Sequence, residues 1–232
     1  MNKDERDCPT PAWTHGDLAD GSQRIESDAS IVHVCRHGLV DNPSHVLYSR
    51  LPGFHLSPEG HAMADRLARH FADVPLTHLR TSPLERAQET MAPIAATRPN
   101  LAVQVDWRLI EADSAMQGQP KGPLSLSLAR PANWKLFIPP SRQRWGEGFA
   151  PMASRMLSAI ADAAYEAGPG GQAVVVSHQA PIWAARRLAE RKFLFNIPLT
   201  RQCALASVTT FAVSTDGQVR FVRYQDVINQ AP

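Results

Sequence analysis

The chain has 232 residues, 44% of them hydrophobic, and a formal net charge of +2. This length suits one large α/β domain, and the apolar content excludes a chain that is disordered throughout. The small net charge gives no indication of nucleic-acid binding, which calls for a strongly basic surface.

Charge is unevenly distributed along the chain. Residues 1–30 hold seven acidic and three basic residues, and the remainder holds 21 basic and 15 acidic residues. A basic body without a long basic run favours a small anionic ligand over a polyanion, although a solvated surface explains the same count. No apolar run could span a bilayer and residues 1–21 contain no apolar signal segment, so we expect a cytoplasmic protein without membrane contact.

Three widely spaced cysteines, Cys8, Cys35 and Cys203, form no Cys-x-x-Cys motif. They predict neither a disulfide framework nor a zinc site. The histidines also lack a metal-ligand spacing. We therefore expect no metal and no cofactor.

Residues 1–28 are polar and aperiodic, which predicts a flexible N-terminal tail before a single domain over residues 29–228. The apolar run 31–35 predicts a buried strand, in which His33 takes a core hydrogen bond. A helix over 57–71 follows, with Ser57 as its N-cap and Pro58 as its first residue.

Strands are predicted over 76–82 and 101–109, with a helix between them over 82–95 that carries a capping box from Ser82 to Glu85. Beyond the irregular stretch 112–145 we expect a helix over 147–166, a central strand over 173–178, a helix over 181–192 and a hairpin over 207–225. This alternation predicts a three-layer α/β/α sandwich with a mostly parallel sheet. The hairpin offers an edge strand for a homodimer.

Ligands of such folds bind beyond the carboxyl ends of the strands. Charged residues follow four of the predicted strands, namely Arg36 with His37, then Arg86, Glu111 and His178. These types suit a phosphoryl group. Arginine binds it with a bidentate fork, and a neutral histidine can attack phosphorus. A protonated second histidine can donate to its oxygens, and a carboxylic acid can protonate the leaving alkoxide.

Four spaced motifs carry a resemblance to a known family. "VCRHG", "SPLERAQET", "LIEA" and "VVVSHQ" occur in the order, and at the kind of positions, found in the histidine phosphatase superfamily, also called phosphoglycerate mutase-like. "WGEGF" resembles its Gly-Glu-Ser segment. The resemblance covers roughly residues 30–225 and favours the phosphatase branch.

The resemblance implies a role for each matching position. His37 is the expected nucleophile, Glu111 the proton donor, and His178 a catalytic partner; Arg36, Arg86 and Asn42 are expected to bind phosphate. Arg50 and Gln179 are candidates for contact with a small phosphorylated substrate, and Gly38 is expected to let the backbone approach the ligand.

Several alternatives stay open at this point. Asp113 and Glu147 compete with Glu111 as the acid. A phosphoglycerate-type mutase is the nearest rival, but the Pro-rich stretch between Glu111 and His178 is short, and Leu39 stands where mutases keep Glu. A catalytically silent binder of phosphorylated ligands is the rival from another class. Four aromatic residues could receive an apolar part of the substrate: Phe54, Trp134, Phe137 and Trp145.

Overall fold

The structure is a computed structural model that describes residues 28–120, 146–192 and 201–229. Its centre is a six-stranded sheet with the order β3-β2-β4-β1-β5-β6. Four neighbouring strands are parallel, and β5 and β6 run as an antiparallel hairpin beside β1. The strands are β1 (Ser30–Arg36), β2 (Leu76–Thr81), β3 (Val103–Val105), β4 (Gln172–Ser177), β5 (Val208–Val213) and β6 (Val219–Gln225).

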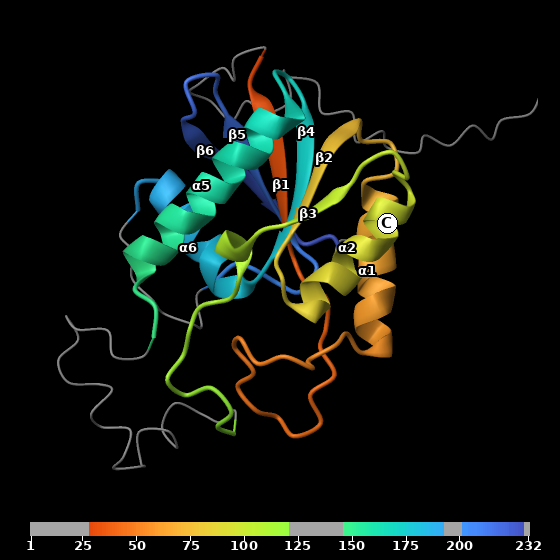
Figure 1. The fold of residues 1–232 in the computed structure, drawn as a ribbon, viewed down its shortest axis with the longest axis vertical. Helices are drawn as coiled ribbons and strands as arrows, with labels where there is room; N and C mark the ends of the chain where they lie inside the picture. Colours follow the sequence, from red (N-terminus) through yellow and green to blue (C-terminus); the bar gives the residue numbers. More distant parts are fainter. Residues whose placement is uncertain (1–27, 121–145, 193–200, 230–232) are drawn as a thin grey trace, which may run out of the picture.

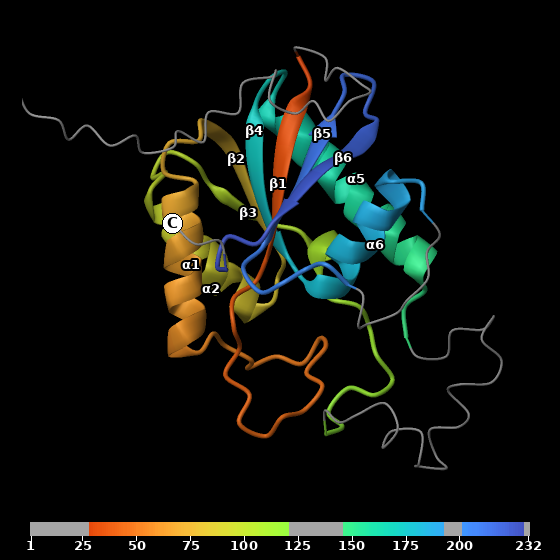
Figure 2. The same ribbon diagram turned by 180° about the vertical axis from the view of Figure 1, so that it is seen from behind.

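Helices cover both faces of this sheet, so the predicted three-layer sandwich with a mostly parallel sheet is confirmed. Figures 1 and 2 show one helix pair on each face. The first pair is α1 (Pro58–His70) and α2 (Glu85–Ala96), and the second is α5 (Phe149–Ala167) and α6 (Gln179–Ala189). Each pair encloses its own apolar core against the sheet.

Strand β1 belongs to both cores because its side chains alternate between the faces. Val32 and Val34 pack with α5, whereas Cys35 packs on the side of α1 and α2. His33 shares that second side, where its ring lies 5.4 Å from that of Phe71. A strand buried on both faces is well held, which fixes the residues at its carboxyl end.

The predicted hydrogen bonding of His33 in the core is confirmed. Its Nδ1 lies 3.3 Å from Thr210 Oγ1, and its Nε2 lies 3.0 Å from Gln172 Oε1. Burial lowers the pKa of His33 to about 4, despite the hydrogen bond to Gln172. The ring is therefore neutral at physiological pH.

The predicted capping box of the second helix is wrong. Helix α2 begins at Glu85 with Leu84 as its N-cap, and no side chain caps it. Ser82 Oγ lies instead 2.7 Å from His178 Nε2, and the carboxylate of Glu85 accepts from the N–H of Gly53 at 3.1 Å. Both polar groups are used by tertiary contacts that local sequence spacing does not show.

The third strand is shorter than the predicted range 101–109. Only Val103–Val105 pair with β2, and residues Trp107–Leu109 form a 3-10 turn, η1. The carboxylate of Asp106 accepts from the N–H of Arg108 at 2.9 Å and so turns the chain away from the sheet.

Several predictions fall outside these observations. The tail 1–28, apart from Asp28, and the aromatic residues Trp134, Phe137 and Trp145 lie outside the described residues. Within the described ranges no helix is both long and apolar enough to cross a bilayer. The single domain, the homodimer and the cytoplasmic location stay predictions.

His33 provides a test of the buried core. Its pKa is lower in the folded chain than in the unfolded one, where it is 6.5. Its contribution to stability is therefore intact above pH 6.5 and is lost as the pH falls towards 4. From pH 7.5 to pH 5, His33→Gln should lose less unfolding free energy than the wild type, by on the order of 2 kcal/mol. Urea unfolding at both values measures it, and equal losses would contradict the buried neutral ring.

Candidate active site

The two motif histidines lie at the carboxyl ends of the adjacent parallel strands β1 and β4. His37 follows the last residue of β1, and its N–H donates to the carbonyl of Ser177 at 3.1 Å. His178 follows β4 and is the N-cap residue of α6. The ring centroids of His37 and His178 are 5.1 Å apart, so strand pairing alone brings the two motifs together.

The His37 ring is held in one tautomer. Its Nδ1 lies 2.8 Å from the carbonyl oxygen of Gly38, and because a carbonyl can only accept, Nδ1 must carry the proton. Burial, followed by the charges of Arg36 and Arg86, lowers the pKa of His37 well below its ordinary value. The neutral ring therefore presents an unprotonated Nε2.

Gly38 is required by close backbone packing. A Cβ at Gly38 would lie 2.6 Å from the carbonyl oxygen of Gly60 in α1. The N–H of Gly38 donates to Thr90 Oγ1 at 3.1 Å, and this hydroxyl donates to the carbonyl of Arg86 at 2.7 Å. The approach that Gly38 permits is thus to helix α1, and the expected approach to a ligand stays a prediction.

The second histidine, His178, is fully buried and also neutral. Burial, then the unfavourable interaction with a protonated His37 and the charges of Arg86 and Arg36, lowers its pKa well below the ordinary value. Its Nε2 lies 2.7 Å from Ser82 Oγ. Its Nδ1 is buried and has no hydrogen-bond partner among the described residues.

Two arginine side chains complete the cluster. Arg86, on the first turn of α2, is fully buried, and its Nη2 donates to the carbonyl of Ser49 at 2.7 Å. Its Cζ lies 4.9 Å from the ring centroid of Tyr48. Arg36 Nη1 donates to the carbonyl of Cys203 at 2.7 Å. Burial lowers the pKa of Arg86, although the carboxylate of Glu111 opposes this effect.

Four buried nitrogen atoms of these residues have no partner in the described part of the chain: Arg36 Nε, Arg86 Nε, Arg86 Nη1 and His178 Nδ1. Leaving a buried donor unpaired costs about 1–3 kcal/mol, and more for a charged group. An anion that bears several acceptor oxygens would satisfy these donors and offset the positive charge. The arrangement is that of a site for a phosphate-like ion.

Glu111 places a carboxyl group beside this cluster. It follows η1, and its Oε1 accepts from the N–H groups of Ala112 at 2.8 Å and Ala180 at 3.3 Å. Its Oε2 accepts no hydrogen bond within the described ranges. Of its predicted competitors, Asp113 is exposed and bonds the N–H of Ser114, while Glu147 accepts from Arg50 and Arg155.

Three residues that were predicted to contact substrate or phosphate do not contribute to this cluster of unpaired donors. Both polar atoms of the Asn42 amide bond the backbone of Val46, at 2.9 and 3.1 Å, which closes the loop after β1. Arg50 donates from Nε to the carbonyl of Glu111 at 2.7 Å and from Nη2 to Glu147 at 2.8 Å. Gln179 is half-buried at the start of α6. Their ligand contacts stay predictions.

Sequence analysis missed three residues of this region. Tyr48 lies against the guanidinium of Arg86 and stacks on Phe54 at 5.1 Å. Ser82 bonds His178, although its position had indicated a helix cap. Arg201 is half-buried, and it lies near enough to Glu111 and Arg36 for their charges to act on its pKa, which burial lowers. Only Ser82 lies inside a motif, so only Ser82 carried a sequence signal.

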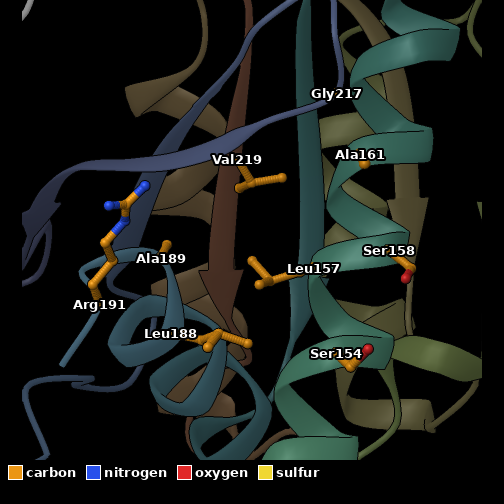
Figure 3. Close-up of a pocket in the computed structure, with 9 residues that line it drawn as sticks. All are labelled: Ser154, Leu157, Ser158, Ala161, Leu188, Ala189, Arg191, Gly217 and Val219. Carbon is orange, nitrogen blue, oxygen red and sulfur yellow. The ribbon is translucent and has the colours of Figure 1, made fainter. Parts of the chain in front are cut away.

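A groove lies away from this site, between α5, α6 and the β5–β6 turn (Figure 3). Leu157, Leu188 and Val219 contribute apolar side chains to it, and Ser154, Ser158 and Arg191 contribute polar ones. It contains none of the residues described above.

Comparison with known proteins gives a family and close relatives by sequence. Residues 32–227 match the Histidine phosphatase superfamily (branch 1). An uncharacterized protein of Mycobacterium tuberculosis is 44% identical over 194 residues, which cover 84% of this chain and 95% of the relative.

Solved structures share the fold at low sequence identity. A mycobacterial glucosyl-3-phosphoglycerate phosphatase has a TM-score of 0.68 at 23% identity and covers 83% of this chain and 97% of its own. A phosphoserine phosphatase of Entamoeba histolytica has a TM-score of 0.65 at 18% identity, with coverages of 85% and 97%. A phosphoglycerate mutase of Bacillus anthracis has a TM-score of 0.64 at 20% identity, with coverages of 86% and 94%.

Binding of inorganic phosphate tests the cluster of unpaired donors. We expect phosphate to raise the Tm of the wild type, because it binds only the folded chain. Arg86→Lys should need about tenfold more phosphate for the same increase, since lysine keeps the charge and loses the fork. Arg98→Lys is the matched control, because Arg98 binds backbone carbonyls of Phe71, Ala72 and Val74 instead. An unchanged phosphate response in Arg86→Lys would contradict the site.

Proposed function

The chain belongs to the histidine phosphatase superfamily, branch 1, and from that premise we propose that it is a metal-independent phosphomonoesterase acting through phosphorylated His37. One observation carries the proposal. A neutral histidine with a proton on Nδ1 stands among four buried nitrogen atoms that lack partners in the described residues. The substrate is a small phosphorylated molecule, and water is the final acceptor.

In the first step the lone pair of His37 Nε2 forms the N–P bond as the bond from phosphorus to the ester oxygen breaks. The carbonyl of Gly38 holds the Nδ1 proton and so stabilises the positive charge that develops on the ring. Arg86 and Arg36 stabilise the charge on the equatorial phosphoryl oxygens, because Arg86 is buried and both side chains are already held by backbone carbonyls.

His178 supports the same oxygens as a neutral donor. If the hydroxyl of Ser82 donates to Nε2, the neutral ring carries its proton on Nδ1, the atom without a partner in the described residues. This refines the expectation of a protonated histidine, because the low pKa of His178 keeps the ring neutral before the ligand binds.

Glu111 is proposed to handle the proton at the ester oxygen. It gives a proton to the leaving alkoxide in the first step. In the second step it takes a proton from water, whose oxygen attacks phosphorus and releases phosphate and free His37. Support comes from its position next to Arg86 and Arg201, at the cluster of unpaired donors, and from Oε2, which accepts no hydrogen bond in the described ranges.

The solved structures that share this fold include both phosphatases and a mutase, so the substrate and the phosphoryl acceptor have to be identified by experiment. Two are phosphatases whose names specify glucosyl-3-phosphoglycerate and phosphoserine, and one is a mutase. We propose hydrolysis for this chain because Leu39 replaces the carboxylate that mutases keep after Arg-His-Gly. A screen of phosphorylated metabolites against the purified protein identifies the substrate.

The activity is tested with p-nitrophenyl phosphate in the presence of EDTA. We expect steady turnover by the wild type and a loss of about a thousandfold or more in His37→Ala, which lacks the nucleophile. His61→Ala is the matched control, since His61 is exposed on α1, and it should keep wild-type turnover.

Three outcomes would contradict the proposal. Undiminished turnover in His37→Ala would show that His37 is not the nucleophile. Interconversion of phosphoglycerate isomers faster than phosphate release indicates a mutase. Phosphate binding without hydrolysis of any ester in the screen indicates a silent binder.

A further inference from the structure

A single carboxylate, that of Glu147, holds two arginine side chains from different parts of the chain. Its Oε2 accepts from Arg50 Nη2 at 2.8 Å and from Arg155 Nη2 at 2.7 Å. Its Oε1 accepts from Arg155 Nε at 2.5 Å. Bidentate pairs between arginine and a carboxylate are among the strongest and most directional contacts in proteins. Glu147 therefore fixes both guanidinium groups in position.

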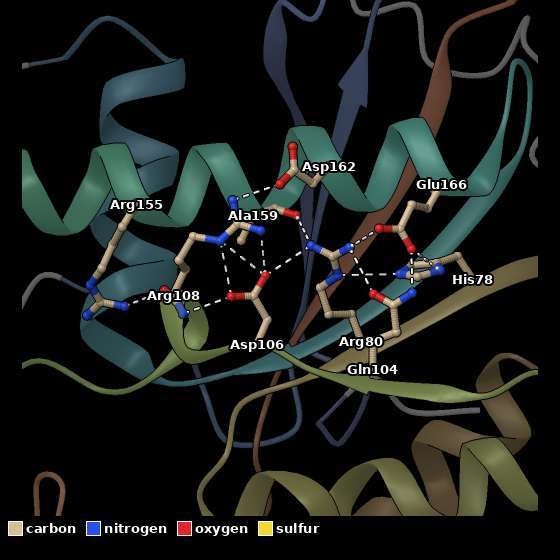
Figure 4. A network of polar contacts seen from close by, with 9 residues as sticks. All are labelled: His78, Arg80, Gln104, Asp106, Arg108, Arg155, Ala159, Asp162 and Glu166. Atoms are coloured by element: carbon tan, nitrogen blue, oxygen red, sulfur yellow. Dashed lines mark hydrogen bonds and ion pairs between the residues drawn. The ribbon is translucent and has the colours of Figure 1, made fainter.

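Each of these arginines also binds the backbone of the segment that carries Glu111. Arg50 Nε donates to the carbonyl of Glu111 at 2.7 Å, and Arg155 Nη1 donates to the carbonyl of Arg108. Figure 4 shows Arg155 reaching Arg108 from α5. Both ends of the segment 108–111 thus accept hydrogen bonds from arginine side chains, Arg155 and Arg50, that pair with the same Glu147 carboxylate.

The place of Glu147 is itself set by backbone contacts. Gly146 and Ser114 form an antiparallel bridge. Gly146 has φ 138°, and a Cβ there would lie 2.0 Å from the carbonyl oxygen of Asp113. Only glycine allows the backbone at position 146 to lie this close to Asp113. The close packing places the next residue, Glu147, beside the segment that carries Glu111.

The amino end of the same segment is anchored separately. Asp106 accepts from Arg80 Nη1 at 3.0 Å and from Arg108 Nη2 at 2.7 Å, and Arg80 also pairs with Glu166 at 2.9 Å (Figure 4). These ion pairs tie residues 106–108 to β2 and α5. Glu147 therefore governs mainly the carboxyl end of the segment, where Glu111 leaves the turn.

We propose that Glu147 is a positioning residue that orients the proton donor Glu111 through Arg50 and Arg155. The inference rests on the proposed phosphatase reaction. Glu147 itself is excluded as the donor by its contacts, because both of its oxygens already accept from guanidinium groups. It acts on the reaction only through the backbone that carries Glu111.

Phosphate binding has a different support. Arg86 reaches this region through the carbonyl of Ser49, whose Oγ donates to the carbonyl of Ala112 at 2.5 Å. These contacts do not include Glu147. Removing its charge should therefore disturb proton donation and leave the phosphate clamp in place.

Leaving-group dependence separates the two roles. An alkyl phosphate needs a proton on its poor leaving group, whereas the nitrophenolate of p-nitrophenyl phosphate leaves without one. We expect Glu147→Gln to lower kcat/KM about 10- to 100-fold for β-glycerophosphate and less than about threefold for p-nitrophenyl phosphate. Phosphate should raise its Tm as in the wild type.

Four further variants test whether Glu147 acts through Glu111. Glu111→Gln should show the same selective loss, and the double variant with Glu147→Gln should be no slower on the alkyl phosphate than Glu111→Gln alone, because the residues act as one unit. Arg50→Gln removes the side chain that joins Glu147 to the carbonyl of Glu111, so it should also lower the rate on the alkyl phosphate more than on p-nitrophenyl phosphate. This variant replaces Glu147→Gln in the test if Glu147→Gln does not fold. Glu166→Gln is the matched control, because it breaks the ion pair with Arg80 at the far end of the network and should show no dependence on the leaving group.

Equal losses on both esters in Glu147→Gln, or an additional loss in the double variant, would overturn the positioning role while the phosphatase proposal stands. A wild type inactive on both esters, or a Glu111→Gln variant without selectivity, would instead overturn the proposed reaction and with it this inference.

Discussion

The burial of the Arg86 guanidinium is the constraint on which the rest of the site depends. Removing an ionised group from water costs several kcal/mol unless charge and hydrogen bonds replace the solvent. Here the described chain supplies one hydrogen bond, from Nη2 to Ser49, and the face of the Tyr48 ring. The other two nitrogens stay unpaired within the described residues. The fold therefore carries a cost at this point that an anionic ligand can offset.

The same positive charge sets the state of both histidines. Arg36 and Arg86 disfavour protonation of His37 and His178, in addition to the effect of burial. A neutral His37 is what nucleophilic attack on phosphorus requires, and the Gly38 carbonyl decides which nitrogen attacks. In the proposed reaction the same two charges bind the phosphoryl oxygens and keep the His37 ring neutral. Glu147 accepts hydrogen bonds from Arg50 and Arg155. These two arginines in turn donate to backbone carbonyls of the segment that carries Glu111.

Much of this architecture was predictable from sequence because it follows from local patterns. The apolar runs that end in Arg36-His37 and Ser177-His178 predicted two strands of a mostly parallel sheet, and the residues after each strand were the candidate site; the structure adds that the two strands are neighbours. The α2 cap and the length of β3 were not predictable. The Ser82 hydroxyl is hydrogen-bonded to His178, and the carboxylate of Asp106 ends the strand by accepting from the N–H of Arg108. Tyr48 and Arg201 come from loops, where no periodicity indicates which side chains turn inward.

The central claim is that a phosphoryl group is carried by His37. The most direct measurement is rapid quenching during turnover, followed by mass spectrometry of the digested protein. The account predicts a phosphoryl group on the peptide that contains His37, stable in base and lost in acid. Turnover of substrate with no such modification, or with the phosphoryl group on another residue, would contradict it.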